Sequence, residues 1–346
     1  MKRISFSLLA GLAVLLAASD ARAFTPCSFS SDGSTWTLQG SCVTDSTIVV
    51  TVPNLAGNGF TITAIDPAGD HFRGAIVQAG IDTLNIDNLH VTSSGLADVC
   101  DEGADRLRGI LWDGASGSAT LVSVNDVNQN PTASVLSGCQ EGNAFEVRNF
   151  GSSATTIHVT LDTVTATNYQ KTGIVCNGES TCTITDSKVI GHGPQPYIAQ
   201  NGVQFGFGSS SNSIKRSEVD GNAYTGSSDV SGGIIVVAGP YYRSPFSVGD
   251  QIMNNTLKGN DIGVWLTQIN ADFSAPATQT NVKVIGNAIS SNAFTNGYPY
   301  QAGIADQGNN DKLINNTISG LGYQSPGIAI DASTTFTNRP KVHANK

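Results

Sequence analysis

The sequence predicts an all-β chain that folds as a solenoid of stacked parallel coils. Two repeated patterns predict it: a bend-centred frame that returns every 23 to 38 residues, and a short apolar strand that begins with Gly or a small residue. No segment after residue 23 shows helical periodicity. Short β-branched strands at this spacing are typical of a right-handed parallel β-helix, here with about eight or more coils.

The first pattern is a frame with one aliphatic residue before a tight bend and one after it. It consists of an aliphatic residue, two polar or small residues that often include Asn, one further residue and a second aliphatic residue. Counted from its first aliphatic residue, the frame begins at Ile86, Val124, Leu161, Ile184, Ile214, Ile252, Val284 and Leu313. A constant frame separated by insertions of variable length is the signature of a solenoid.

Asparagines gather at or beside this bend. They are Asn254, Asn255, Asn287, Asn315 and Asn316. Asparagine tolerates a left-handed backbone, and its amide can hydrogen-bond to the coils on either side. Lys188 and Glu218 occupy the same frame position in successive coils, which predicts an ion pair on the surface.

The second pattern is the apolar strand of each repeat. It is written GILW at 109, NAFEV at 143, GIVC at 173, GVQF at 202, GIIVV at 233, GVWL at 263, GIAD at 303 and GIAI at 327. Side chains alternate between the two faces of a strand. If the core holds Ile110, Phe145, Val203, Ile234 and Val264, the outward side chains are Asp113, Glu146, Arg148, Gln204 and Trp265.

The first 23 residues have the pattern of an export signal. A charged start precedes a short apolar stretch, and the small-residue site ARA stands before Phe24. This predicts a secreted or periplasmic protein with a signal peptide at 1–23. We expect an N-terminal cap at 24–44, the β-helix at 45–335 and a polar C-terminal tail at 336–346.

The balance of charge limits the partners. Removal of the signal peptide leaves 15 basic and 26 acidic residues, a net charge of −11. Such a surface repels nucleic acid and anionic membranes unless a local basic patch overrides the global field. We therefore expect no nucleic-acid partner and no membrane insertion, and the oligomeric state stays open.

Six cysteines in an exported chain favour disulfides over metal. The simplest pairing joins the close pairs Cys27 with Cys42 and Cys176 with Cys182, and then Cys100 with Cys139. Zinc would need ligand spacings such as CxxC or HxxxH, which the sequence lacks.

The frame, the Asn-bearing bend and the export signal resemble those of the exported right-handed β-helix proteins, which include pectate lyases, alginate lyases and epimerases, and polygalacturonases. The resemblance covers residues 45–335. It implies a polysaccharide that lies along the sheet beside the longest loops, here the insertions before the second strand of each coil. Six of the eight tyrosines stand in those insertions.

These tyrosines either line a ligand face or pack the loops onto the coil. Aromatic rings with a polar tip suit sugar rings. The predicted substrate-binding residues are Tyr169, Tyr197, Gln200, Asn201, Gln204, Tyr224, Trp265, Tyr298 and Tyr300.

Among the reactions of this family, glycoside hydrolysis fits the sequence least. It needs two carboxyl groups across the scissile bond. The triplet at 191–193, Gly-His-Gly, resembles a polygalacturonase motif, but the chain lacks that family's Asn-Thr-Asp segment and its Asp-Asp doublet. A lyase or epimerase needs a base and a cation that neutralises a sugar carboxylate. Our candidates for these two roles are Arg148, Lys171, His192, Tyr197 and Arg243.

One acidic loop is a candidate for calcium. Asp98, Asp101, Glu102 and Asp105 lie between Gly-rich flanks at 98–106, and hard oxygen ligands suit Ca²⁺. The alternative is a solvated acidic loop that Cys100 holds in place.

Two hypotheses of function follow from the sequence. The first is an exported β-helix protein that binds, and cleaves or epimerises, a polysaccharide. The second is a non-catalytic surface or matrix protein whose solenoid serves adhesion or assembly. A close cluster of base, cation and tyrosine in one groove would favour the first.

Overall fold

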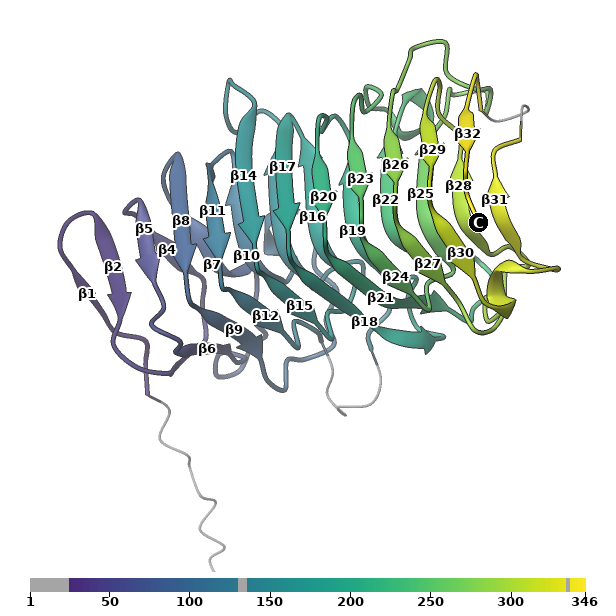
Figure 1. Ribbon diagram of the computed structural model, residues 1–346. Helices are drawn as coiled ribbons and strands as arrows, with labels where there is room; N and C mark the ends of the chain where they lie inside the picture. Colours follow the sequence, from purple (N-terminus) through teal and green to yellow (C-terminus); the bar gives the residue numbers. More distant parts are fainter. Residues whose placement is uncertain (1–24, 130–135, 334–336) are drawn as a thin grey trace, which may run out of the picture.

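The computed structural model describes residues 25–129, 136–333 and 337–346, whose strands form three sheets wound into a right-handed parallel β-helix (Figure 1). Each full coil runs through one strand of sheet 1, one of sheet 3 and one of sheet 2, and the next coil pairs with it in parallel. The predicted fold class is therefore confirmed. The predicted signal peptide lies outside the described residues.

Sheet 1 has the strand order β1 (Phe29–Ser31), β2 (Thr35–Leu38), β5 (Asn54–Ala56), β8 (Thr83–Asp87), β11 (Ser116–Thr120), β14 (Ile157–Asp162), β17 (Ser180–Thr185), β20 (Ser213–Lys215), β23 (Gln251–Met253), β26 (Lys283–Ile285), β29 (Lys312–Ile314) and β32 (Lys341–His343). Sheet 2 has the order β4 (Ile48–Val50), β7 (Ala75–Ala79), β10 (Arg108–Asp113), β13 (Asn143–Asn149), β16 (Thr172–Gly178), β19 (Asn201–Gly206), β22 (Gly232–Ala238), β25 (Ile262–Gln268), β28 (Ala302–Asp306) and β31 (Ile328–Asp331).

Sheet 3 has the order β3 (Cys42–Thr44), β6 (Thr61–Ala64), β9 (His90–Ser93), β12 (Ser123–Asn125), β15 (Thr165–Thr167), β18 (Lys188–Gln195), β21 (Glu218–Tyr224), β24 (Thr256–Lys258), β27 (Ala288–Ser290) and β30 (Thr317–Ser319). Three short 3-10 turns lie in the described loops: η1 (Gly103–Asp105), η2 (Pro240–Tyr242) and η3 (Leu321–Tyr323). No described segment forms a helix long and apolar enough to cross a membrane.

The core is a set of aliphatic columns that run along the helix axis. In sheet 1, Ile184, Ile214 and Ile252 of successive strands are direct register partners and are fully buried. Burial of such apolar surface is the main stabilising term of the fold. One predicted repeat start is wrong: Val124 lies in β12 of sheet 3, and Ala119 of β11 takes the column position between Ile86 and Leu161.

The asparagine bend is confirmed and divides into two roles. Asn254 and Asn315 adopt left-handed backbone, each with φ of 55°. Asn255, Asn287 and Asn316 are buried, and each amide donates to the side-chain oxygen of its counterpart one coil further on. Because every amide in the column is paired, the bend can be buried without unsatisfied polar groups.

The two ends of the solenoid differ. At the N-terminal end, the antiparallel hairpin of β1 and β2 closes sheet 1, and the Cys27–Cys42 disulfide ties residues 25–27 to β3. At the other end, β32 pairs in parallel with β29, so sheet 1 continues into the described segment 337–346. The predicted pairing of all six cysteines is confirmed.

Candidate functional site

A groove lies on the outer face of sheet 2. It consists of three cavities of about 400, 410 and 90 Å³ that follow one another from β10 toward β31. Gln140 and Lys171 line both the first and the second cavity, and Trp265 lines both the second and the third. The shared residues show that the three cavities lie next to one another along sheet 2, and we call them together the groove.

Strand alternation builds the floor of this groove as the sequence predicts. Ile110, Phe145 and Val203 are buried in the core, and their neighbours face outward. Glu146, Val175, Gln204, Ile235 and Trp265 are successive register partners, so they form one row along the floor. The outward orientation predicted for Glu146, Gln204 and Trp265 is therefore confirmed.

The walls come from the loops on the two sides of sheet 2. Loops before its strands contribute Gln140, Tyr197 and Asp229, and β21 contributes its last residue, Tyr224. Loops after its strands contribute Phe150, Phe207 and Tyr242.

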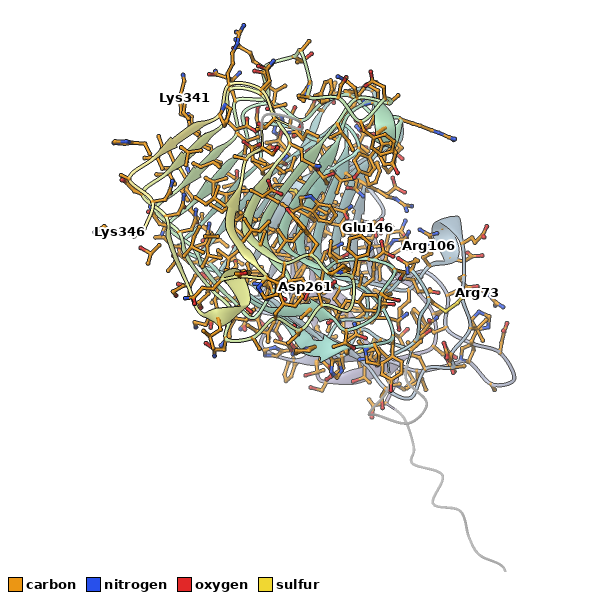
Figure 2. All side chains as sticks on the ribbon, turned by 90° about the vertical axis from the view of Figure 1, so that its right-hand side faces the viewer. Arg73, Arg106, Glu146, Asp261, Lys341 and Lys346 are labelled. Carbon is orange, nitrogen blue, oxygen red and sulfur yellow. A yellow bond between two sulfur atoms is a disulfide. The ribbon has the colours of Figure 1, made fainter. Side chains whose placement is uncertain are left out.

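The first cavity is basic. Its lining includes Arg106, Arg108, Arg148 and Lys171 around the carboxylate of Glu146. Seen along the coil stack from its C-terminal end, Arg106 and Glu146 lie on the same side of the solenoid (Figure 2). Arg108 donates to Glu146 at 2.8 Å, and Arg148 lies 3.4 Å from the other oxygen of Glu146.

Two of these four cations have no carboxylate partner in the described part of the chain. Arg148 also pairs with Asp113 at 2.6 Å, so Arg108 and Arg148 are both neutralised locally. Lys171 Nζ donates to the carbonyl oxygen of Ala199 at 2.7 Å, and Arg106 forms no ion pair. The cavity therefore offers uncompensated positive charge to a ligand, which favours an anionic one.

Lys171 has an unusual protonation equilibrium. Desolvation by burial lowers its pKa to about 8, with Asp229 acting weakly in the opposite direction. A lysine with such a pKa is partly neutral near physiological pH, which is what a general base requires.

The second cavity is aromatic. Tyr197, Tyr224, Tyr242 and Trp265 line it together with Asn201. Beyond Tyr242 the aromatic wall continues outside the cavity, because Tyr241 packs edge-on against Tyr242 with ring centres 4.9 Å apart and contacts Phe273 at 4.7 Å. Flat rings next to polar tips suit the faces of sugar rings.

The third cavity is small and acidic. Tyr300 donates its hydroxyl to Asp331 at 2.7 Å, and Asp306 lies beside them. Burial and the adjacent Asp331 raise the pKa of Tyr300.

The groove brings together eight of the thirteen residues predicted for catalysis or substrate binding. They are Arg148, Lys171, Tyr197, Asn201, Gln204, Tyr224, Trp265 and Tyr300.

Two predicted contacts are instead parts of the interior. Tyr169 is 0% exposed, and its hydroxyl donates to Asn222 at 2.6 Å inside the coil. Gln200 is also fully buried, where it accepts from the backbone N–H of His192 and donates to the carbonyl of Tyr169. Neither side chain can meet a ligand, which corrects the prediction.

Three further predicted residues lie outside the groove. His192 belongs to β18 of sheet 3, on another face of the solenoid. Arg243 ends the η2 turn with its side chain exposed, and Tyr298 is exposed on a loop whose backbone bonds to Gly226. None of the three lines a cavity of the groove.

The acidic loop does not assemble the predicted calcium site. Asp101 lies 3.0 Å from the ring of His71, and Asp98 lies beside Cys139. Within the described residues, no three His, Cys, Asp or Glu side chains converge in a way that could hold a metal ion. Asp98 and Asp101 thus contact different neighbours.

Sequence reasoning missed several groove residues. Arg108 stands directly before the second-strand motif at Gly109 and Arg106 two residues earlier, so both lie outside the motif whose alternation predicts the outward side chains. Phe150 and Phe207 each follow immediately after a sheet 2 strand. A recurrent aromatic residue at strand ends was the signal available for this wall.

Solved structures with a similar course of the chain exist at low identity. The Dettilon tailspike protein matches with 14% identity and a TM-score of 0.43, over 88% of this chain and 62% of its own. Pre-mature gene product 12 of bacteriophage phi29 matches with 12% identity and a TM-score of 0.41, over 81% of this chain and 41% of its own. This chain thus spans less than two thirds of both proteins.

A double mutant of the periplasmic alginate epimerase AlgG matches with 12% identity and a TM-score of 0.41, over 93% of this chain and 80% of its own. No protein-family model and no curated protein matches the chain. At such identities a likeness concerns the fold alone. From its own sheets and register, the chain is a right-handed parallel β-helix repeat protein with a basic and aromatic groove on sheet 2.

Proposed function

We propose that this exported β-helix protein binds an acidic polysaccharide along the groove of sheet 2 and acts on it as a lyase or an epimerase. The observation that carries the proposal is the pair of unpartnered cations, Arg106 and Lys171, in a chain of net charge −9. A positive cavity on an acidic protein selects for anionic groups by a local field. The aromatic cavity next to it offers ring faces to the neighbouring sugars.

The chemistry rests on Lys171. Its lowered pKa makes it the groove residue best suited to take the proton from the carbon that bears a sugar carboxylate. Arg106 lies in the same cavity and would neutralise the charge that develops on that carboxylate. In a lyase reaction the electron pair of the broken C–H bond forms a C=C bond, and the glycosidic oxygen departs with a proton. In an epimerase reaction a proton returns to the opposite face of the same carbon.

Hydrolysis has less support. Glu146 is the carboxylate of the first cavity, and its two oxygens accept from Arg108, Arg148 and Asn143. A glycosidase needs one carboxyl group that donates a proton and a second one opposite it. Glu146 is held as a structural anion instead.

The experiment is a binding and turnover panel on the mature chain. Sodium polygalacturonate, sodium alginate and chondroitin sulfate are the acidic polymers, and dextran is the neutral control. We expect binding to one or more acidic polymers and none to dextran. An unsaturated product, seen by ultraviolet absorbance, assigns a lyase, and an altered sugar configuration, seen by NMR, assigns an epimerase. Failure to bind any acidic polymer would overturn the proposal and favour the non-catalytic surface protein.

A further inference from the structure

The groove has an end wall beside its basic cavity. The loop 94–107 between β9 and β10 carries η1, and its residues Gly103 and Arg106 line the first cavity. On the sheet, the floor row continues from Glu146 to its register partner Leu111. Leu111 faces outward, yet it is 2% exposed and lines none of the three cavities. The open part of the floor row therefore ends at Glu146, before Leu111.

This wall is fixed to the solenoid at several points. The Cys100–Cys139 disulfide joins it to the loop before β13. Glu141 accepts from the backbone N–H of Asp101 at 2.9 Å and of Leu107 at 2.6 Å.

The side chain of Arg108 also holds the loop through hydrogen bonds. Its guanidinium donates to the carbonyl oxygens of Gly103, Ala104 and Arg106 while it pairs with Glu146. Multiple buried bonds of this kind hold a loop in one conformation. The wall is thus a built part of the groove and does not need a ligand to form it.

In the other direction, toward the C-terminal coils, the cavities continue along sheet 2. The floor of the groove continues over Gln204, Ile235 and Trp265 toward the third cavity near the last coils. A polymer that enters from this side meets the wall at Arg106.

We propose that this site binds the end of an acidic polysaccharide chain, with the terminal sugar against the loop 94–107. The inference rests on the proposed function and adds a chain-end specificity to it. The carboxylate of the terminal sugar meets Arg106 and Lys171, and the following sugars lie over the aromatic cavity. A chain that bound through its middle would have to pass through the wall.

The test is the binding stoichiometry as a function of chain length. Oligogalacturonates of defined length and long polygalacturonate are titrated into the wild-type protein by calorimetry, and the same is done with oligomannuronates and alginate. End binding predicts that the number of protein molecules bound per chain does not change with chain length. A number that rises in proportion to length would overturn the inference and leave the proposed function standing. Absence of binding to all of these acidic probes would instead remove the proposed function itself, and the inference with it.

A pair of variants tests the wall directly. Cys100→Ser combined with Cys139→Ser removes the covalent attachment of the wall, and we expect the number of proteins bound per long chain to rise. Cys27→Ser combined with Cys42→Ser removes a disulfide at the N-terminal cap and should leave the stoichiometry unchanged. Thermal melts identify any variant that fails to fold, and the wild-type length series still decides the question in that case. A length-independent stoichiometry in folded Cys100→Ser/Cys139→Ser would contradict the role of the wall.

Discussion

Arg108 Nε lies 2.8 Å from Glu146 Oε2, and both side chains are almost fully buried beneath the first cavity. Arg108 comes from the first residue of β10 and Glu146 from the middle of β13, so the pair joins two coils and the end wall of the groove. A buried pair is sensitive to the loss of either partner, because the remaining charge stays buried without compensation.

The first prediction follows from this pair. Glu146→Ala is expected to lower the free energy of unfolding by about 3–5 kcal/mol, since Arg108 loses its counter-ion in a buried place. Glu218→Ala is the matched control: Glu218 pairs with Lys188 and Lys258 at 3.3 and 3.2 Å on the exposed face of sheet 3. Its loss should cost less than about 1 kcal/mol. Urea unfolding measures both, and equally small changes would argue against a structural role of Glu146.

The second prediction concerns the asparagine bend. Asn287 accepts from the backbone and the amide of Asn255 and donates to Ile252 and Asn316. Asn287→Ala leaves several of these buried groups unpaired, so we expect a loss of about 3 kcal/mol or more in the free energy of unfolding.

Asn254→Ala is the control for this bend. Asn254 is exposed and has a left-handed backbone with φ of 55°. Its replacement by a residue with a less tolerant backbone should cost only about 1–2 kcal/mol. Chemical denaturation measures both variants. If Asn254→Ala loses more free energy of unfolding than Asn287→Ala, the backbone conformation rather than the buried amides determines the stability of the bend.

The third prediction is a pH profile. Lys171 has a pKa lowered to about 8 because burial disfavours its charged form, so it becomes a base as the pH rises through that value. With a polymer that turns over, the initial rate should increase with pH and level off above about pH 8. Lys171→Arg keeps the positive charge and should bind the polymer but lose the turnover. A wild-type rate that declines through this range, or an unchanged profile in Lys171→Arg, contradicts the assignment of the base.

The fourth prediction separates two tyrosines. Tyr197 is 44% exposed and lines the aromatic cavity, whereas Tyr169 is buried and donates to Asn222. Tyr197→Ala should weaken polymer retention without a change in melting temperature. Tyr169→Phe should leave retention unchanged and lower the free energy of unfolding by about 1 kcal/mol. Affinity electrophoresis and thermal melts test both, and unfolding of Tyr197→Ala would assign that side chain to packing.

The fold could be predicted from the sequence because its determinants repeat. Lys188 and Glu218 are direct register partners, as their common frame position predicts, and their charged atoms lie 3.3 Å apart. The outward row of sheet 2 also follows from strand alternation once the core residues are known.

The groove could be predicted only in part, because its walls come from loops whose length and sequence differ from one repeat to the next. Tyr169 and Tyr197 stand in equivalent insertions. Only Tyr169 is buried, because its hydroxyl donates to Asn222, which lies 53 residues further along the chain. Arg106 reaches the first cavity through a loop whose position depends on Glu141 and a disulfide. Such long-range contacts leave no local pattern in the sequence.

Calorimetric titration of polygalacturonate, alginate and dextran into the wild type, Arg106→Gln and Arg73→Gln tests the basic groove most directly. Arg73 pairs with Asp70 at 2.7 Å, lies 3.9 Å from Asp101 of the loop 94–107 and lines none of the three cavities, so it serves as the control for loss of one charge beside the wall (Figure 2). We predict binding of an acidic polymer but not dextran, a loss of about tenfold in affinity for Arg106→Gln, and wild-type affinity for Arg73→Gln. Equal binding of dextran, or an unchanged affinity in Arg106→Gln, would contradict the account.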